Sequence, residues 1–188
     1  LGAINNELGK WRDIYLVNEG ANTLDNARNI INMYHPRRRL DCGTWGVMGI
    51  GMGYSIGAAV TDNKQVVAIV GDSAFGFSGM EIETICRYKL PVTIIVFNNG
   101  GIYRGDEING TSSDPAPTSL LMSSQYEKLM EAFGGYGVCA KSIDELVNAL
   151  KNSLNNKHPT LINCIIDASA GVESGHLKNL NPKTNSVK

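Results

Sequence analysis

Residues 66–101, with the sequence VVAIVGDSAFGFSGMEIETICRYKLPVTIIVFNNGG, decide the fold. The stretch begins and ends with short runs that are apolar on both faces, Val66–Val70 and Val92–Phe97, and such strands belong inside a sheet covered on both sides. Between them, residues 80–89 have helical spacing, and Pro91 marks the return to a strand. The predicted apolar side of this helix comprises Met80, Ile82, Ile85 and Cys86. The stretch therefore predicts a β-α-β unit with parallel strands.

The same alternation of strand and helix continues outside this unit. Two further strands are predicted at Ile14–Asn18 and Thr160–Ile166, and two amphipathic helices at Ser123–Phe133 and Ile143–Leu154. The helix from Ile143 is preceded by Ser142, which forms a capping-box pattern with Glu145. Residues 108–118 show no periodicity and are predicted to form a loop. Together these elements predict an α/β fold: an open parallel sheet with helices on both faces.

Composition narrows the class of protein. The chain has 188 residues, enough for one ordinary domain. Its net charge of -1 gives no basic excess of the kind that nucleic-acid binders carry, and no apolar run approaches the roughly 20 residues of a membrane helix. We therefore expect a soluble protein that binds neither nucleic acid nor a membrane. Because the chain starts at Leu1 rather than Met, we also expect it to be a piece of a longer protein.

The cysteines indicate the redox environment. None of the four has the spacing of a zinc site or of a CxxC motif. Cys86 and Cys164 lie in apolar runs and are predicted to be buried small hydrophobic residues. A reduced, cytoplasmic setting is therefore expected.

Glycine is unusually frequent, with 21 residues that gather in clusters. One cluster, from Gly49 to Gly57, superficially satisfies a dinucleotide-binding fingerprint, but no strand precedes it, as that fingerprint requires. It instead predicts a helix whose small-residue face, with Gly49, Gly53 and Gly57, packs closely against a neighbour. The clusters around Gly71 and Gly100 fit a backbone that closely approaches a ligand.

Two polar residues follow the two strands of the central unit. Asp72 ends the first strand, and Asn99 ends the second after a β-α-β length of chain. A right-handed crossover places both at the carboxyl ends of parallel strands, where open α/β sheets bind ligands. A carboxylate and an amide oxygen suit Mg²⁺ or Ca²⁺, and a main-chain carbonyl of the following Gly100-Gly101 could add a third oxygen. Alternatively, Asp72 caps the next helix and residues 98–101 are only a turn.

Taken together, the motif GDS-x(24)-NN, from Gly71 to Asn99, resembles the GDG-x(24–27)-NN signature of thiamine diphosphate (ThDP) enzymes. Ser73 replaces the last glycine of the first element, a small departure because the family tolerates small residues there. The resemblance implies that Asp72, Asn99 and the Gly101 carbonyl bind Mg²⁺, and that the metal holds the diphosphate of ThDP.

Other segments are similar to oxalyl-CoA decarboxylases and 2-hydroxyacyl-CoA lyases. Residues 19–23, EGANT, resemble the loop that contacts the diphosphate in these enzymes, and residues 46–49, GVMG, resemble the segment beneath the aminopyrimidine. By that resemblance Met48 bends the cofactor into its V shape, although the sequence alone favours a place for it in the hydrophobic core. The implied cofactor-binding residues are Ala21, Asn22, Thr23, Gly46, Met48, Gly71, Ser73, Ala74 and Ile102.

The end of the chain narrows the resemblance further. Residues 170–175, AGVESG, and residues 180–182, LNP, resemble the C-terminal segment that closes over the active site of oxalyl-CoA decarboxylases. Ser174 is the implied substrate contact, and His176 stands where some members have arginine. The last residues are not a peroxisomal SKL signal, which disfavours a peroxisomal lyase. The expected division is a ThDP- and Mg²⁺-binding domain at 1–170 and a closing tail at 171–188.

The resemblance implies a ThDP- and Mg²⁺-dependent decarboxylase that converts oxalyl-CoA to formyl-CoA and CO₂. It also implies that the glutamate that activates the cofactor lies on a pyrimidine-binding domain of another subunit, in a homo-oligomer expected to be a tetramer. That domain and the middle domain are absent from this chain, which contains no proton-transfer residue of its own and is expected to be inactive alone.

Several alternatives remain open at this point. One is a 2-hydroxyacyl-CoA lyase or another ThDP-dependent carbon-carbon lyase or carboligase, and another is a non-catalytic α/β binding module. Arg28 and Asn29 match residues near CoA in the family, but a solvated pair on a helix surface explains them equally well.

Overall fold

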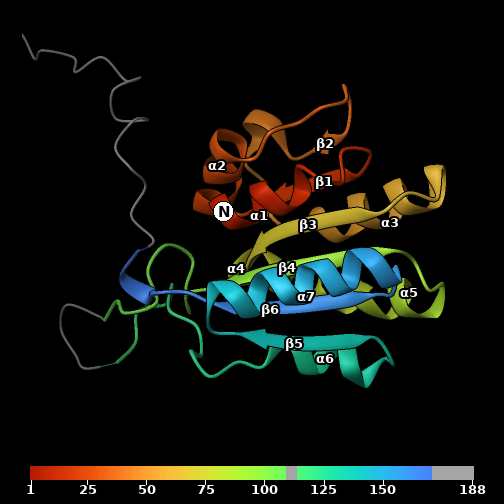
Figure 1. Cartoon of the computed structure of the whole chain (residues 1–188). Helices are drawn as coiled ribbons and strands as arrows, with labels where there is room; N and C mark the ends of the chain where they lie inside the picture. Colours follow the sequence, from red (N-terminus) through yellow and green to blue (C-terminus); the bar gives the residue numbers. More distant parts are fainter. Residues whose placement is uncertain (109–113, 171–188) are drawn as a thin grey trace, which may run out of the picture.

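The computed structural model describes residues 1–108 and 114–170, which form one parallel sheet with helices on both faces (Figure 1). Neighbouring strands follow the order β2-β1-β3-β4-β6-β5, and every pair is parallel. The strands are β1 (Tyr15–Glu19), β2 (Arg39–Leu40), β3 (Val66–Gly71), β4 (Val92–Asn98), β5 (Tyr136–Ala140) and β6 (Thr160–Ile165). The predicted fold class is confirmed, and all four predicted strands are present.

Helices cover the two faces of this sheet unequally. Helices α1, α2 and α7 pack on one face, while α3, α4, α5 and α6 pack on the other (Figure 1). Their bounds are α1 (Gly2–Leu8), α2 (Ala21–Ile30), α3 (Gly51–Asp62), α4 (Asp72–Ser78), α5 (Ile82–Arg87), α6 (Tyr126–Ala132) and α7 (Ile143–Asn156). Short 3₁₀ turns lie at Gly43–Trp45, Gly79–Glu81 and Ala168–Ala170.

The hydrophobic core lies on both sides of the central strands. In β3 and β4, Ile69 and Ile95 face the helices α1, α2 and α7, whereas Val70 and Val96 face the opposite layer. All four are fully buried, and burial of each such side chain contributes about 1.5–3 kcal/mol. The apolar runs therefore reflect a sheet covered on both faces, as expected from the sequence.

The start of α7 follows the predicted capping pattern with one difference. Ser142 Oγ accepts a hydrogen bond from the Glu145 backbone N–H at 3.2 Å. The Glu145 carboxylate accepts from the N–H of Lys141 at 2.7 Å, one residue before the cap. The cap thus fixes both the first turn of α7 and the chain that enters it.

Three packing predictions need correction. Gly53 and Gly57 lie on the exposed side of α3, and a Cβ at either would meet nothing within 4 Å. They therefore do not pack against a neighbour within the described structure. Met80 is 66% exposed, because the 3₁₀ turn at Gly79–Glu81 changes the helical phase before α5 begins at Ile82. Cys164 is buried as predicted, whereas Cys86 is only half-buried.

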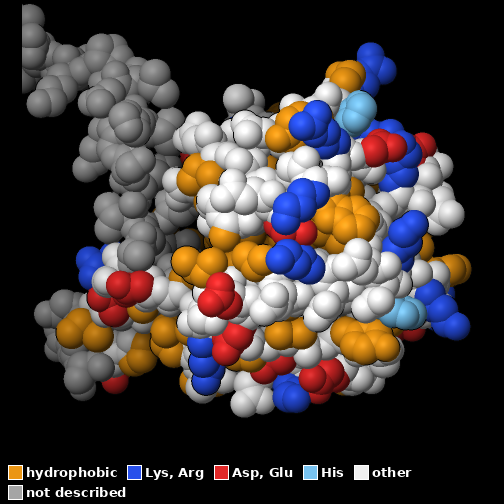
Figure 2. All heavy atoms as spheres, viewed as in Figure 1, with side chains coloured by type: hydrophobic (Ala, Val, Ile, Leu, Met, Phe, Trp, Pro, Cys, Tyr) orange, Lys and Arg blue, Asp and Glu red, His pale blue; other side chains and the backbone are white. Residues whose placement is uncertain are grey.

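The surface carries no single-sign patch on the face that Figure 2 shows, where acidic, basic and hydrophobic side chains are interspersed. Within residues 1–108 and 114–170, no helix has the length and apolar character needed to cross a membrane.

Candidate functional site

The strand order creates a crevice at the carboxyl ends of β1 and β3. β1 lies between β2 and β3 in the sheet, so the connection after β1 leads to one side and the connection after β3 leads to the other. Open α/β sheets bind ligands where the strand order reverses in this way. The first turns of α2 and α4 begin at this point, directly after the two strands.

A cavity of about 470 Å³ occupies this crevice, a size typical of small-molecule sites. The predicted site residues that line it are Ala21, Asn22, Thr23, Met48, Gly71, Asp72, Ser73, Ala74, Asn99, Gly101 and Ile102. Four separate segments of the sequence are thus brought together as expected. Gly46 does not line the cavity, although it lies two residues before Met48, and Ser174 lies outside the described residues.

Asp72 is the most deeply enclosed charged group of this cavity, at 1% exposure. It is the first residue of α4 rather than its N-cap, which is Gly71. Its Oδ1 accepts from the Ser73 N–H at 2.7 Å, and its Oδ2 accepts from the N–H groups of Gly100 and Gly101 at 2.7 and 3.2 Å. The carboxylate therefore joins the chain after β3 to the chain after β4.

Burial raises the pKa of the Asp72 carboxyl above its usual range, although backbone N–H groups that donate to it act in the opposite direction. Among the described residues, no Lys, Arg or His lies at ion-pair distance from Asp72. A buried carboxylate without a countercharge is unfavourable, and a bound cation would remove this penalty.

The loop after β4 places further oxygen atoms beside Asp72. Asn99 donates from its Nδ2 to the Tyr103 carbonyl at 2.9 Å, which leaves its Oδ1 as the acceptor end of the amide. The loop pairs with the chain near Ser119 through the Gly100 carbonyl and the Ile102 N–H, and so does not use the Gly101 carbonyl. Among the hydrogen bonds between described residues, none therefore uses the Asn99 Oδ1 or the Gly101 carbonyl, and both oxygens remain for a ligand.

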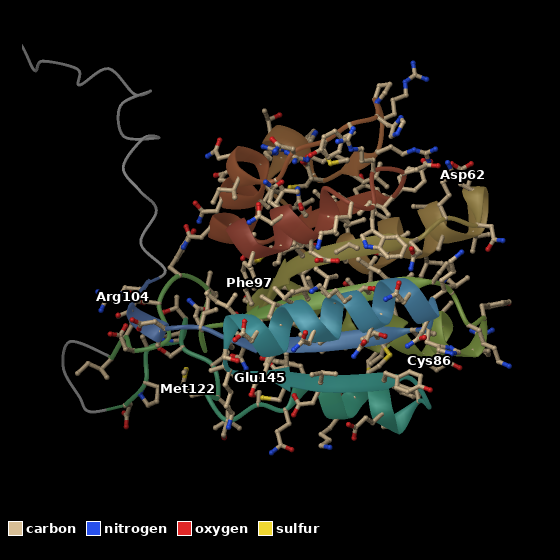
Figure 3. The ribbon with its side chains drawn as sticks, viewed as in Figure 1. Asp62, Cys86, Phe97, Arg104, Met122 and Glu145 are labelled. Atoms are coloured by element: carbon tan, nitrogen blue, oxygen red, sulfur yellow. The ribbon has the colours of Figure 1, made fainter. Side chains whose placement is uncertain are left out.

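Glycine is required in this loop because the backbone folds back on itself. A Cβ at Gly105 would overlap the Asn99 carbonyl oxygen, and one at Gly101 would overlap the Arg104 carbonyl oxygen. The loop lies beyond the carboxyl ends of the strands, where Figure 3 shows Arg104 and Met122. Asp62 and Cys86 lie at the opposite end of the sheet in the same view.

This donor set fits a hard divalent cation with a diphosphate. Within the described chain, no group of three or more His, Cys, Asp and Glu side chains could hold a metal ion, so a site here depends on Asp72 together with amide and carbonyl oxygens. Mg²⁺ accepts such a mixed oxygen set and completes it with phosphate and water. The first turn of α2, Ala21–Thr23, faces the same cavity, and a helix N-terminus favours a phosphate group.

Sequence reasoning missed one wall of the cavity. Lys141, Ser142 and Ile143, at the start of α7, line it together with Leu1, Phe97 and Cys164. The helix and its cap were predicted, but strand β5, which brings this helix to the edge of the sheet, was not. Had β5 been predicted, the start of α7 would have been placed beside the cavity as well.

Residues 20–164 match the family described as thiamine pyrophosphate enzyme, C-terminal TPP binding domain. The chain belongs to this family. Thiamine pyrophosphate (TPP) is the same compound as ThDP, so the match names the cofactor that the motif implied. The TPP-binding domain includes every described cavity residue predicted from the sequence.

Individual relatives agree with this assignment. The chain is 65% identical over 185 residues to the oxalyl-CoA decarboxylase of Escherichia coli K12, covering 97% of this chain and 33% of that protein. It is 53% identical over 173 residues to the 2-hydroxyacyl-CoA lyase of Arabidopsis thaliana, covering 88% of this chain and 30% of the relative. The chain thus spans about a third of the length of these curated relatives.

A solved structure supports the fold alone. The benzoylformate decarboxylase of Polynucleobacter necessarius superimposes with a TM-score of 0.73 at 21% sequence identity, covering 89% of this chain and 32% of that one. The described chain therefore shares its fold with part of that enzyme.

Proposed function

We propose that the full-length protein containing this TPP-binding domain decarboxylates oxalyl-CoA to formyl-CoA and CO₂. The observation that carries the cofactor assignment is Asp72, a buried carboxylate with no countercharge in the part of the chain that the structure describes, which faces Asn99 and the first turn of α2 across one cavity. The 65% identity to an oxalyl-CoA decarboxylase supports the choice of substrate.

Each wall of the cavity has a role in this proposal. Asp72, Asn99 and the Gly101 carbonyl hold Mg²⁺. Bound ThDP supplies an electron sink for the charge left when a bond beside a carbonyl breaks. The diphosphate end is held by the first turns of α2 and α4, and by the loop after β4, through Ala21, Asn22, Thr23, Gly71, Ser73, Ala74 and Ile102. Met48 supports the aminopyrimidine, with Gly46 giving the backbone room to approach it.

The rest of the active site lies outside the described residues. We place the activating glutamate on a pyrimidine-binding domain of another subunit in a homotetramer, and Ser174 in a tail, residues 171–188, that contacts substrate. Residues 1–170 form the ThDP domain in this division. The full-length protein is assigned to the cytoplasm, and the present chain alone is expected to be inactive.

A titration of ThDP into the full-length protein, with and without Mg²⁺, tests the cofactor site. Asp72→Ala is expected to reduce the Mg²⁺-dependent affinity at least about tenfold, since it removes a metal ligand. Asp62→Ala is the matched control because it removes an exposed carboxylate at the opposite end of the sheet (Figure 3). Mg²⁺-dependent binding that survives Asp72→Ala unchanged would refute the site.

A second candidate, 2-hydroxyacyl-CoA lyase activity, is favoured by the 53% identity to the Arabidopsis enzyme. The two reactions release different products, so one experiment separates them. Formyl-CoA formed from oxalyl-CoA supports the decarboxylase, whereas an aldehyde formed from a 2-hydroxyacyl-CoA supports the lyase. A protein that binds ThDP and forms neither product contradicts both.

A further inference from the structure

Glu19 is another buried carboxylate beside the crevice, at the end of β1, and the proposed chemistry does not use it. It is the last residue of β1 and is 1% exposed. Within the described structure it forms no ion pair. Burying a carboxylate without an ion-pair partner lowers the stability of the fold. Its presence here therefore indicates a role for its hydrogen bonds that an apolar side chain could not fill.

The Glu19 side chain crosses from β1 to the chain just before α3. Its Oε1 accepts from the backbone N–H of Gly49 and from that of Ile50, the second at 2.8 Å. These N–H groups have no partner inside the helix that begins at Gly51. One carboxylate oxygen therefore fixes two consecutive peptide groups at this entry turn.

Steric contact fixes the same turn from the other side. A Cβ at Gly51 would lie 2.5 Å from Glu19 Oε2, so only glycine lets the carboxylate approach the helix this closely. Gly49 adopts a positive φ of 101°, and a Cβ there would lie 3.1 Å from the Cβ of Phe77 on α4. The turn is thus held between Glu19 and α4.

Two walls of the cavity meet at Glu19. Its backbone leads directly into Gly20 and the first turn of α2, which line the cavity on one side. Its carboxylate holds Gly49, which directly follows Met48 on the other side. The length of one glutamate side chain therefore sets the separation between the α2 wall and the Met48 wall.

We propose that Glu19 is a positioning residue that sets where Met48 projects into the cofactor cavity. This inference rests on the proposed function, because it takes the Met48 wall to support the aminopyrimidine. Glu19 itself touches neither substrate nor cofactor. Its effect on turnover passes through Met48, whereas the groups proposed to hold Mg²⁺ and diphosphate stay in place without it.

The test compares Glu19→Ala and Glu19→Gln in the full-length protein with Glu127→Gln. Glu127 is the matched control, a buried glutamate on α6 that also accepts from an amide, Asn163 Nδ2 at 2.7 Å. We expect Glu19→Ala to lower kcat at least tenfold while the dissociation constant for Mg²⁺ with inorganic diphosphate changes less than threefold. Glu19→Gln keeps one acceptor oxygen and should retain most of the activity, and Glu127→Gln should leave both quantities unchanged.

A double-variant comparison distinguishes positioning from general stability. In a Met48→Ala background, Glu19→Gln and Glu19→Ala should reduce kcat no further, since their effect passes through Met48. An equal loss of kcat in both backgrounds overturns the proposal, as does a matching loss of diphosphate binding. If Glu19→Ala does not fold, Glu19→Asp, whose side chain is one methylene too short to reach both N–H groups, replaces it in both backgrounds and gives the same decision.

Hydrogen exchange in the protein without cofactor gives a readout independent of the reaction. The amides of Gly49 and Ile50 should exchange at least tenfold faster in Glu19→Ala and at the wild-type rate in Glu127→Gln. Unchanged exchange at both amides overturns the proposal even if oxalyl-CoA is the substrate. If the Gly49 and Ile50 amides exchange faster in Glu19→Ala but the full-length protein has no decarboxylase activity, the positioning role of Glu19 stands and the proposed function is wrong.

Discussion

Raising the pH above 9 should selectively destabilise the folded chain through Cys164. This thiol lines the cavity and is buried, and burial raises its pKa from 9.0 to about 11. In the unfolded chain the thiol ionises near pH 9, whereas in the folded chain it stays protonated. The unfolded state therefore binds fewer protons between these values, so the free energy of unfolding falls as the pH rises.

The size of this effect follows from the pKa difference. Two pKa units correspond to about 2.7 kcal/mol once the pH exceeds both values, and about 1.3 kcal/mol of this is lost between pH 8 and pH 10. Below pH 8 the thiol is protonated in both states and contributes no slope.

Urea unfolding of the chain followed by circular dichroism at pH 8, 9 and 10 measures the effect. The comparison is with Cys164→Ala, because other buried groups, including the Tyr126 phenol, also have a raised pKa and contribute to the wild-type slope. The wild type should lose about 1.3 kcal/mol more than Cys164→Ala between pH 8 and pH 10. Cys42→Ala, which removes a half-buried thiol, should behave like the wild type. Parallel pH profiles for the wild type and Cys164→Ala would refute the reasoning.

Three further substitutions test other parts of the structure. Gly105→Ala should weaken Mg²⁺-dependent ThDP binding at least about tenfold in a titration, because the new Cβ displaces the Asn99 carbonyl; an unchanged affinity would contradict this. Ser142→Ala should lower the free energy of unfolding by about 1 kcal/mol in urea, because the α7 cap is lost. Thr93→Val leaves its buried hydroxyl partner Ser153 unpaired and should destabilise by about 1–3 kcal/mol. Adding Ser153→Ala should recover part of that loss, and a purely additive loss would count against the hydrogen bond.

The interior strands of the sheet could be predicted from the sequence because they consist almost entirely of apolar residues. Val66–Val70 is apolar at every position and Val92–Phe97 at every position except Thr93, a pattern typical of strands covered on both faces. Once these strands were placed, chain direction alone brought Asp72 and Asn99 together at one edge. The edge strands β2 and β5 carry no such run, since β2 has two residues and β5 is largely half-exposed.

Other features could not be predicted because no residue type reports them. Glu19 acts on backbone N–H groups, which every residue except proline offers, so its partners leave no trace in the sequence. Gly53 and Gly57 were predicted to pack closely, but a small residue is equally compatible with open space beside a helix. Only the orientation of α3 on the sheet decides between these two possibilities, and that orientation depends on long-range contacts.

The hydrogen bonds of Asp72 and Glu19 lead to main-chain atoms, and this has a consequence for how such a cavity evolves. Replacing a neighbouring side chain leaves these N–H groups where they are, so much of the sequence around the cavity is free to diverge. Inserting or deleting one residue between β4 and Gly105, in contrast, shifts the register of every donor that follows. Loop length in this cavity is therefore expected to be under stronger selection than residue identity, apart from the two carboxylates and the glycines that face them.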